Sequence, residues 1–472
     1  MRELHERIRA YAKRVQTRLH MPGHKGNKPF LDAYFCYEAD VTELEESDDL
    51  HRPRSVLLEM RRRAARFWSA KAAYLLTNGA TSGNLIALHA LWHQIQNQGS
   101  GQPFDQQREK IVLIDRHAHR SCFHALRLLK ASYRFIAAPV FSEKIPCAVN
   151  GYEEVKRAIE SCPDAVGFLV LTQPTYEGLY STELKKIVDY CHQREILVYL
   201  DAAHGAHLPF LSEAEFNPGA CGVDLFTMSL HKTLNAATST AILCKGSDRV
   251  ETALLDLFFD VFETSSPSYP LLLSIEDCLD DLETQDLCLA QNLKVIERLK
   301  AILRDKNYVL LSDCIDEKKQ GIDPFKMYIS AAEGDLTPLR LAFRESGLRA
   351  EYDQPWGMLL MFGVRADYRE LERVFWQFSP MRRVKTEKSV SALPPLPSLL
   401  SERIEASFPK DVQRLHIEEA VGQKLAEDLF FYPPGIPFRL QGERLTREDV
   451  ILMQKYPQSL GLETGQIRVV DE

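Results

Sequence analysis

The stretch Leu225-Phe-Thr-Met-Ser-Leu-His-Lys-Thr233 has the pattern of a buried β-strand that ends in a short polar turn. Its lysine, Lys232, is flanked by the hydroxyl residues Ser229 and Thr233 and by His231. A lysine that follows a strand is usually an ordinary surface residue, so this stretch alone supports a functional site only weakly. The neighbouring strands decide between the two interpretations.

A second apolar run, Ile196–Asp201, places a carboxylate at the end of the preceding predicted strand. A buried carboxylate is costly unless it accepts hydrogen bonds or pairs with a cation. The protonated ring nitrogen of pyridoxal phosphate (PLP) is such a cation, and the protonated ring stabilises a carbanion at the α-carbon of a substrate. Asp201 and Lys232 together therefore indicate a PLP site.

The segment Tyr74-Leu-Leu-Thr-Asn-Gly-Ala-Thr-Ser-Gly-Asn84 predicts a phosphate site upstream of both residues. It has the pattern of a strand, a glycine-containing turn and the start of a helix. Free N–H groups and the positive end of a helix dipole bind phosphate, here at Ala80, Thr81 and Ser82. Many helix caps share this pattern, so the indication comes from the order: an anion loop, then Asp201, then Lys232.

The region from about residue 71 alternates short apolar runs with amphipathic stretches. This alternation predicts an α/β fold with a mostly parallel sheet covered on both faces, whose ligands gather at the carboxyl ends of the strands. The predicted strands are Ala73–Thr77, Ile111–Asp115, Val166–Thr172, Ile196–Asp201, Leu225–Ser229 and Thr240–Cys244. A second alternation at 325–380 predicts the strands Phe325–Ser330, Leu348–Tyr352 and Met358–Gly363.

The chain of 472 residues is too long for one compact core. We predict an N-terminal arm (1–50), a three-layer PLP-binding large domain (51–275) and a small α/β domain (276–390). A Pro-rich linker (391–400) then leads to a C-terminal domain (401–472).

The net charge of −8 argues against a nucleic-acid surface and is compatible with a cationic substrate. The ten cysteines form no Cys-x-x-Cys pair, which indicates a reduced protein without a zinc site or disulfide frame. The sequence contains neither a signal peptide nor a run of 18 apolar residues, so we expect no membrane contact and a cytoplasmic location.

Several motifs are specific enough to resemble a known family. They are His20-Met-Pro-Gly-His-Lys-Gly26, Asp40-Val-Thr-Glu43, Asp48-Asp-Leu-His51, Asn78-Gly-Ala-Thr-Ser-Gly83, Asp201-Ala-Ala-His-Gly-Ala-His207, Ser229-Leu-His-Lys232, Ser265-Ser-Pro-Ser-Tyr-Pro270 and Tyr432-Pro-Pro-Gly-Ile-Pro437. With them the chain resembles the short members of the Orn/Lys/Arg decarboxylase family, PLP enzymes of the aspartate-aminotransferase fold (fold type I).

The resemblance implies a role for each matching residue. Lys232 would be the Schiff-base lysine, Asp201 would pair with the pyridine nitrogen, and His119 would stack on the ring, although a capping or surface histidine is the alternative. His204 and Thr175 would neighbour the ring. Further phosphate contacts are implied for Ser229 and His231 beside Ala80, Thr81 and Ser82, and for Ser265 and Ser266, which resemble a loop that reaches a neighbouring subunit. We therefore expect a homodimer, or a dimer-based higher oligomer, with active sites at the subunit interface.

The implied activity is decarboxylation of lysine, arginine or ornithine to CO₂ and the amine, as in polyamine biosynthesis. Either Lys232 or His204 would return the proton. Acidic residues that suit a basic substrate, or that simply form solvated surface, are Asp40, Glu43, Asp48, Asp49 and Glu351.

Gln173, Ala202 and Ser239 depart from the family pattern and leave the fit of the substrate open. Three other activities remain as alternatives. One is an aminotransferase, which would need an arginine clamp for the retained carboxylate. Another is a cysteine desulfurase-like enzyme, for which no cysteine lies in a suitable Gly/Ser-rich loop. The third is a PLP-binding homologue with a regulatory or scaffold role and little turnover.

Overall fold

The computed structural model describes most of the chain. The described residues are 3–14, 38–97, 110–136, 149–211, 216–284, 289–316, 318–331, 334–354, 356–364, 368–382, 401, 403–406, 409, 411–432, 436–462 and 464–471. The motif at 20–26 and the predicted linker at 391–400 lie outside them.

An eight-stranded sheet in the order β1-β8-β7-β6-β4-β2-β3-β14 is the largest sheet of the fold. The pairs β6/β7, β2/β4 and β2/β3 are parallel, whereas β8 is antiparallel to both of its neighbours and β14 is antiparallel to β3. The α/β class is thus confirmed, with a sheet that is mixed at its edges. Its strands are β1 (Ala72–Leu76), β2 (Lys110–Asp115), β3 (Ser132–Ile136), β4 (Ala165–Thr172), β6 (Leu197–Asp201), β7 (Leu225–Ser229), β8 (Ala241–Lys245) and β14 (Ile404–Glu405).

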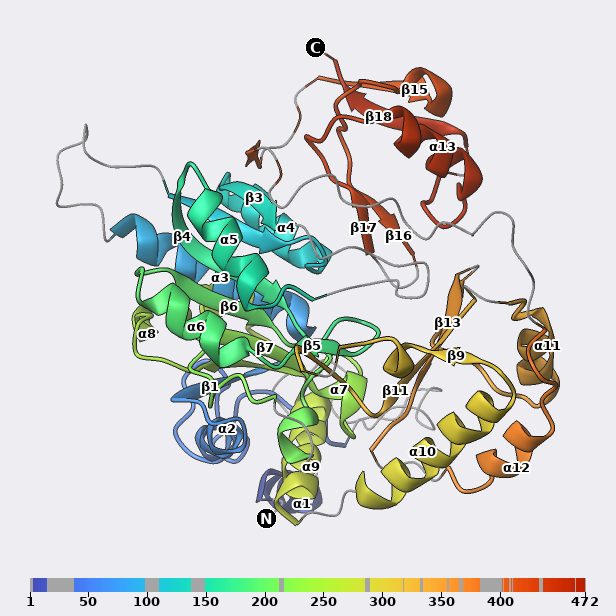
Figure 1. Ribbon diagram of the computed structural model, residues 1–472. Helices are drawn as coiled ribbons and strands as arrows, with labels where there is room; N and C mark the ends of the chain where they lie inside the picture. Colours follow the sequence, from blue (N-terminus) through green and yellow to red (C-terminus); the bar gives the residue numbers. More distant parts are fainter. Residues whose placement is uncertain are drawn as a thin grey trace, which may run out of the picture. The chain divides into compact units, whose positions relative to one another are not determined.

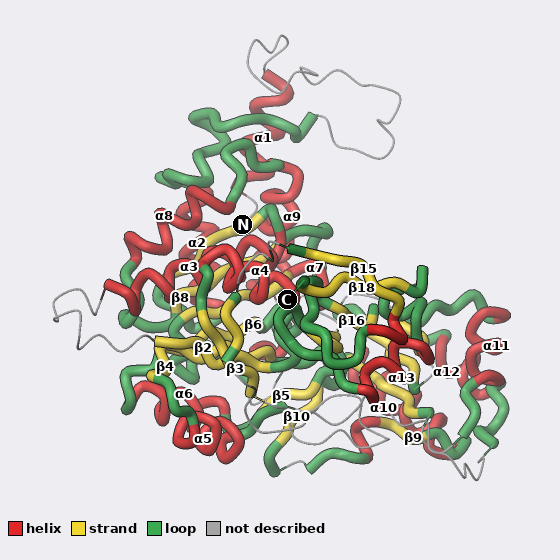
Figure 2. Tube along the Cα trace, turned by 90° about the horizontal axis from the view of Figure 1, so that it is seen from above, coloured by secondary structure: helices red, strands yellow, loops and turns green. Residues whose placement is uncertain are grey.

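The chain divides into two compact units, of which the first comprises Met1–Gln94, Tyr199–Leu289 and Gly363–Ala366. Its helices are α1 (Glu3–Arg14), α2 (Val56–Phe67), most of α3 (Gly79–Asn97), α7 (Leu230–Thr233), α8 (Thr252–Phe262) and α9 (Tyr269–Thr284), with a 3-10 turn at Leu208–Phe210. Within this unit α2 packs against β1, and α1 lies beside α9 (Figures 1 and 2).

The second unit comprises Ile95–Val198, Ala290–Phe362 and Asp367–Glu472. A four-stranded sheet, β12-β13-β11-β9, and three two-stranded pairings accompany its part of the large sheet. Its further elements are α4 (Arg120–Leu129), α5 (Tyr152–Ser161), β5 (Leu179–Ser181), α6 (Leu184–His192), α10 (Leu289–Asp305), β9 (Val309–Leu310), β10 (Gln320–Ile322), β11 (Lys326–Ser330), α11 (Thr337–Glu345), β12 (Tyr352–Gln354), β13 (Gly357–Met361), α12 (Leu371–Trp376), β15 (Val412–His416), β16 (Leu429–Phe431), β17 (Ile436–Arg439), α13 (Arg447–Lys455) and β18 (Gln466–Val470), with 3-10 turns at Leu311–Asp313 and Ile417–Glu419. Helix α5 lies beside α6 in both views (Figures 1 and 2).

The predicted strand Leu348–Tyr352 is wrong in position, because β12 begins only at Tyr352. The amides of Gly347 and Leu348 instead bond back to Arg344 and Phe343 at 3.1 and 2.8 Å, which closes the end of α11. Gly347 has φ +71, the left-handed conformation that such a helix end requires. None of the described helices is both long and apolar enough to cross a membrane.

Candidate active site

Lys232 stands on a single helical turn that follows a fully buried strand. Strand β7 ends at Ser229, and α7 begins at the next residue. Lys232 Nζ lies 3.2 Å from Nε2 of His204. Because an ammonium group can only donate, charged Lys232 uses this Nε2 as its acceptor. The pair thus places a base within hydrogen-bonding distance of the amine.

Backbone hydrogen bonds fix the turn that carries His204 to the neighbouring strand. The amide of Ala202 donates to the carbonyl of Thr227 at 2.9 Å, and the amide of Ser229 donates to the carbonyl of Ala203 at 3.3 Å. The loop after β6 therefore continues the pairing with β7 beyond the end of β6. This continuation positions the histidine beside the lysine.

Asp201 ends β6 and is 2% exposed. One carboxylate oxygen, Oδ1, accepts the amide of Ala203 at 3.1 Å, and the other, Oδ2, accepts Nδ2 of Asn84 at 2.8 Å. Two donors stabilise a buried carboxylate, and a cationic partner would stabilise it further. Asn84 was not among the predicted site residues, although it lies at the end of the predicted anion loop.

The predicted anion loop is organised by a carboxylate that no motif indicated, Glu263. Its Oε1 accepts the amide of Thr77 at 3.0 Å, the Thr77 hydroxyl at 2.6 Å and the amide of Asn78 at 3.1 Å. Its Oε2 lies 3.0 Å from the hydroxyl of Ser82, which is also 3.0 Å from the carbonyl of Gly79. The Ser82 hydroxyl is therefore already engaged within the protein, and its predicted phosphate contact stays a prediction.

Ser239, one of the departures from the family pattern, also contacts this loop. Its hydroxyl donates to the carbonyl of Thr77 at 2.7 Å. Its φ of +80 is unusual for a residue other than glycine, so the surrounding structure holds it in a strained conformation. Glu263 and Ser239 thus hold Thr77, the residue after β1, through its amide and its carbonyl.

Two predicted phosphate ligands lie next to Lys232 in the sequence. Ser229 is buried, and its hydroxyl has no hydrogen-bond partner among the residues that the structure describes. His231 donates from Nδ1 to the carbonyl of Thr240 at 3.0 Å. Burial lowers the pKa of His231, as does the charge of Lys232, and only the carbonyl contact opposes them. His231 is therefore expected to be neutral near neutral pH.

The remaining predicted phosphate ligands of the first unit are more open. Ala80 is half-buried and Thr81 is exposed, both on the first turn of α3. Ser265 and Ser266 are exposed on the loop after α8. That loop begins directly after Glu263, so one carboxylate joins both predicted phosphate loops.

His119 and Thr175 belong to the second unit. His119 is exposed and caps α4, where its Nδ1 accepts the amide of Ser121 at 3.3 Å and lies 2.8 Å from the Ser121 hydroxyl. Thr175 is buried, and its hydroxyl accepts the amide of Leu179 at 3.2 Å. Its carbonyl accepts Nζ of Lys326 at 3.2 Å. The ring contacts implied for His119 and Thr175 stay predictions.

A buried acid of the second unit, Asp115, was not among the candidate residues. It ends β2, and burial raises its pKa to about 7, although the amide of Thr172 and the side chain of Asn150 both donate to it. These donors lie at 3.2 and 2.5 Å. Asp115 therefore titrates near neutral pH.

Comparison with known proteins decides the family. The protein-family model "Orn/Lys/Arg decarboxylase, major domain" matches residues 3–329 of the sequence. The chain belongs to this family. The expectation of a PLP-dependent amino-acid decarboxylase is thereby confirmed.

Relatives of this decarboxylase match it over almost their whole length. An uncharacterised protein of Bacillus subtilis, YaaO, is 29% identical over 98% of this chain and 95% of its own. An arginine decarboxylase of the same organism is 27% identical over 95% and 92%. In fold, the chain is similar to a lysine decarboxylase of Francisella novicida, with a TM-score of 0.75, 16% identity, and coverage of 100% of this chain and 81% of that one.

The acidic residues proposed for substrate binding have varied surroundings in the decarboxylase. Burial alone would raise the pKa of Asp48, but amide donors that include those of Arg54 and Ser55 outweigh it and lower the pKa. Asp49 accepts the amide of His51 at 2.8 Å. Such contacts are typical of structural caps.

The other three candidates are Asp40, Glu43 and Glu351, none of which is fully buried. Asp40 and Glu43 are half-buried, and Glu43 accepts the hydroxyl of Thr42 at 2.5 Å. Glu351 is exposed and accepts the hydroxyl of Tyr176. Binding of the substrate by any of the five acids stays a prediction.

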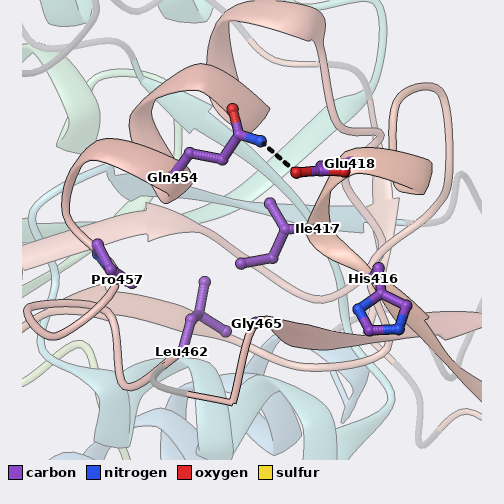
Figure 3. A pocket seen from close by; sticks show the side chains of 7 residues that line it. All are labelled: His416, Ile417, Glu418, Gln454, Pro457, Leu462 and Gly465. Carbon is purple, nitrogen blue, oxygen red and sulfur yellow. Dashed lines mark hydrogen bonds between the residues drawn. The ribbon is translucent and has the colours of Figure 1, made fainter.

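A surface hollow of about 490 Å³ lies in the C-terminal part of the second unit (Figure 3). Its lining consists of His416, Ile417, Glu418, Gln454, Pro457, Leu462 and Gly465. Gln454 donates to Glu418 across it at 3.3 Å. None of the predicted site residues lines this hollow.

Proposed function

We propose that this decarboxylase acts on arginine and releases CO₂ and the decarboxylated amine. The observation that supports the reaction most directly is the Lys232–His204 contact of 3.2 Å beside the buried carboxylate of Asp201. An amine, a base and a carboxylate at the ends of two neighbouring strands are the groups that PLP chemistry requires.

The residues present fit the cofactor. Lys232 would hold its aldehyde carbon covalently, and Asp201 would face the ring nitrogen. The buried Ser229 hydroxyl, which lacks a partner among the described residues, would donate to the phosphate together with the amides of Ala80 and Thr81. When bound, PLP supplies an electron sink for the electron pair that remains at the substrate's α-carbon after CO₂ leaves.

Lys232 and His204 would carry out the proton transfers. Lys232 Nζ must lose a proton before it can act as a nucleophile. His204 Nε2, at 3.2 Å, is placed to accept that proton. The same two atoms are the candidates for returning a proton to the α-carbon, and the turn at 202–205 keeps them together during the exchange.

The choice of arginine rests on the relatives. Arginine decarboxylases match more than nine tenths of this chain at 26–27% identity, whereas lysine decarboxylases of Pseudomonas aeruginosa and Escherichia coli match 54% and 81% of it at 24% and 20% identity. An acidic side chain is needed for the guanidinium group, and a bidentate carboxylate suits it best. We also propose that the protein is a cytoplasmic homodimer that supplies polyamine biosynthesis. In this dimer, Ser265 and Ser266 would contact the partner's site.

The test is to purify the full chain with PLP and incubate it separately with arginine, lysine and ornithine. CO₂ and amine should appear with arginine, and Lys232→Ala should abolish both products. Product from lysine or ornithine alone would refute the choice of substrate. A PLP-loaded protein that releases no CO₂ from any of the three, or that forms a keto acid instead, would refute decarboxylation.

A further inference from the structure

A chain of buried hydrogen bonds leads away from Asp201 into the interior of the first unit. Asn84 donates from Nδ2 to Asp201 Oδ2 at 2.8 Å, and the Tyr199 hydroxyl donates to Asn84 Oδ1. The same hydroxyl lies 2.8 Å from Oγ1 of Thr227. All four side chains are at most 2% exposed, so water does not replace these partners.

The direction of each proton in this chain follows from the chemistry of the groups. A carboxylate only accepts, so the NH₂ group of Asn84 must face Asp201 and its carbonyl must face Tyr199. The single proton of the Tyr199 hydroxyl is then used on Asn84. Thr227 must therefore donate to the Tyr199 oxygen. Every donor consequently points toward Asp201.

Close packing holds Asn84 in place. The preceding residue, Gly83, faces the sheet, and a Cβ atom there would lie 2.6 Å from Cγ2 of Thr227 and 2.9 Å from Cδ1 of Leu76. Both distances are too short for real contacts, so α3 packs directly on β7 and β1 at this point. The close approach brings the Asn84 amide to the carboxylate.

We propose that Asn84 is a positioning residue that keeps Asp201 ionised and oriented, and that Tyr199 and Thr227 act through it. The inference rests on the proposed function, in which Asp201 faces the ring nitrogen of PLP. Hydrogen bonds to the charged form of an acid favour that form. A carboxylate held charged keeps the ring nitrogen protonated, which strengthens both cofactor binding and the electron sink.

The experiment titrates PLP into the cofactor-free full chain and follows the absorption spectrum of the bound cofactor across a range of pH. The variants are Asn84→Ala, Tyr199→Phe, Thr227→Val and Asp201→Asn, with Asn84→Ala also made in the Asp201→Asn background. The matched control is Gln94→Ala, since Gln94 is a buried amide of the same helix whose side chain accepts the amide of Glu251 at 3.1 Å. Thermal unfolding shows which variants fold.

Asn84→Ala should weaken PLP binding about 10- to 100-fold, as expected for a hydrogen bond to a charged group, and shift the pH profile of the spectrum toward that of Asp201→Asn. Tyr199→Phe should weaken binding about 2- to 10-fold and Thr227→Val less, with Gln94→Ala unchanged. In the Asp201→Asn background, Asn84→Ala should add no further loss, because it acts through the missing carboxylate.

Independent, additive losses for Asn84→Ala and Asp201→Asn would overturn the inference. If Asn84→Ala does not fold, a Tyr199→Phe variant with wild-type affinity and a wild-type pH profile would overturn it equally. A wild-type protein that takes up no PLP would instead refute the proposed function.

Discussion

Replacing Glu263 with glutamine should change the stability of the protein and its affinity for PLP in opposite directions. The glutamine carbonyl can still accept the three bonds from Thr77 and Asn78, now at 2.6 to 3.1 Å. Its amide can donate to the Ser82 hydroxyl, which then gives its own proton to the Gly79 carbonyl, 3.0 Å away. The geometry of the loop is retained, and only the charge is lost.

The two effects can be estimated from these contacts. Each hydrogen bond to a charged group contributes about 1.5–3 kcal/mol and each neutral one about 0.5–1.5 kcal/mol. Because the glutamine no longer buries a charge, the lower desolvation cost offsets most of this difference, and the Glu263→Gln variant should lose about 1–2 kcal/mol of unfolding free energy. The carboxylate lies at the N-terminus of α3, the helix end proposed for the phosphate. Two anions at the same helix end repel each other, and charge interactions at a helix terminus are typically about 0.3–1 kcal/mol. Removal of the Glu263 charge should therefore tighten PLP binding about two- to five-fold.

The assay combines urea unfolding of the cofactor-free chain with PLP titration. Glu251→Gln is the matched control, because Glu251 is exposed and lies at the opposite end of α8. Glu263→Ala should behave differently, because it leaves the buried Thr77 amide without its acceptor. We expect this variant to disorder the loop and to weaken PLP binding. Weaker PLP binding by Glu263→Gln, or an unfolding free energy equal to that of the wild type, would refute the reasoning.

Three further predictions concern the proton chemistry and the second unit. Burial raises the pKa of Asp115 to about 7, above the 3.8 of an ordinary carboxyl, so the free energy of unfolding should fall as the pH rises from about 4 to about 7. In urea titrations, the Asp115→Asn variant should lack this fall. Glu443→Ala should lower the free energy of unfolding in urea by about 3–5 kcal/mol, because it leaves the charge of buried Arg116 without its carboxylate partner, whose oxygens lie 2.8 and 2.9 Å from two Arg116 nitrogens. The double variant Arg116→Met with Glu443→Leu should recover most of this loss. His204→Ala should lower kcat about 100-fold or more in a CO₂-release assay with Lys232 intact, and a wild-type kcat would contradict its role as the base.

The strands of the large sheet were predictable where burial on both faces made them continuously apolar. The six predicted strands agree with β1, β2, β4, β6, β7 and β8 to within one residue at each end. Strand β3 was not predicted, because a serine and an arginine interrupt the apolar character of its sequence, Ser132-Tyr-Arg-Phe-Ile136. The short strands of the last 70 residues were missed for a similar reason: Val412–His416 alternates exposed and half-buried positions.

The site divides in the same way. The positions of Asp201 and Lys232 at the ends of neighbouring strands were predictable because each terminates or follows an apolar run. Glu263 and Asn84 were not, since they meet their partners across 186 and 117 residues of sequence. One available signal was the acid directly after the apolar helix α8, since an acid that is buried without a partner would be costly.

The pairing of β6 with β7 explains why the network and the site share one side of the sheet. The strands are parallel, with Asp201 opposite Thr227. Side chains two residues apart in a strand point to the same face, so Tyr199 lies with Asp201 and Ser229 with Thr227. These four are polar positions in otherwise apolar strands, and Asn84 of α3 bonds to two of them. A shift of one residue in the pairing would turn both sets away from each other. Polar side chains at a spacing of two within a buried strand therefore indicate which face of the sheet carries the candidate site.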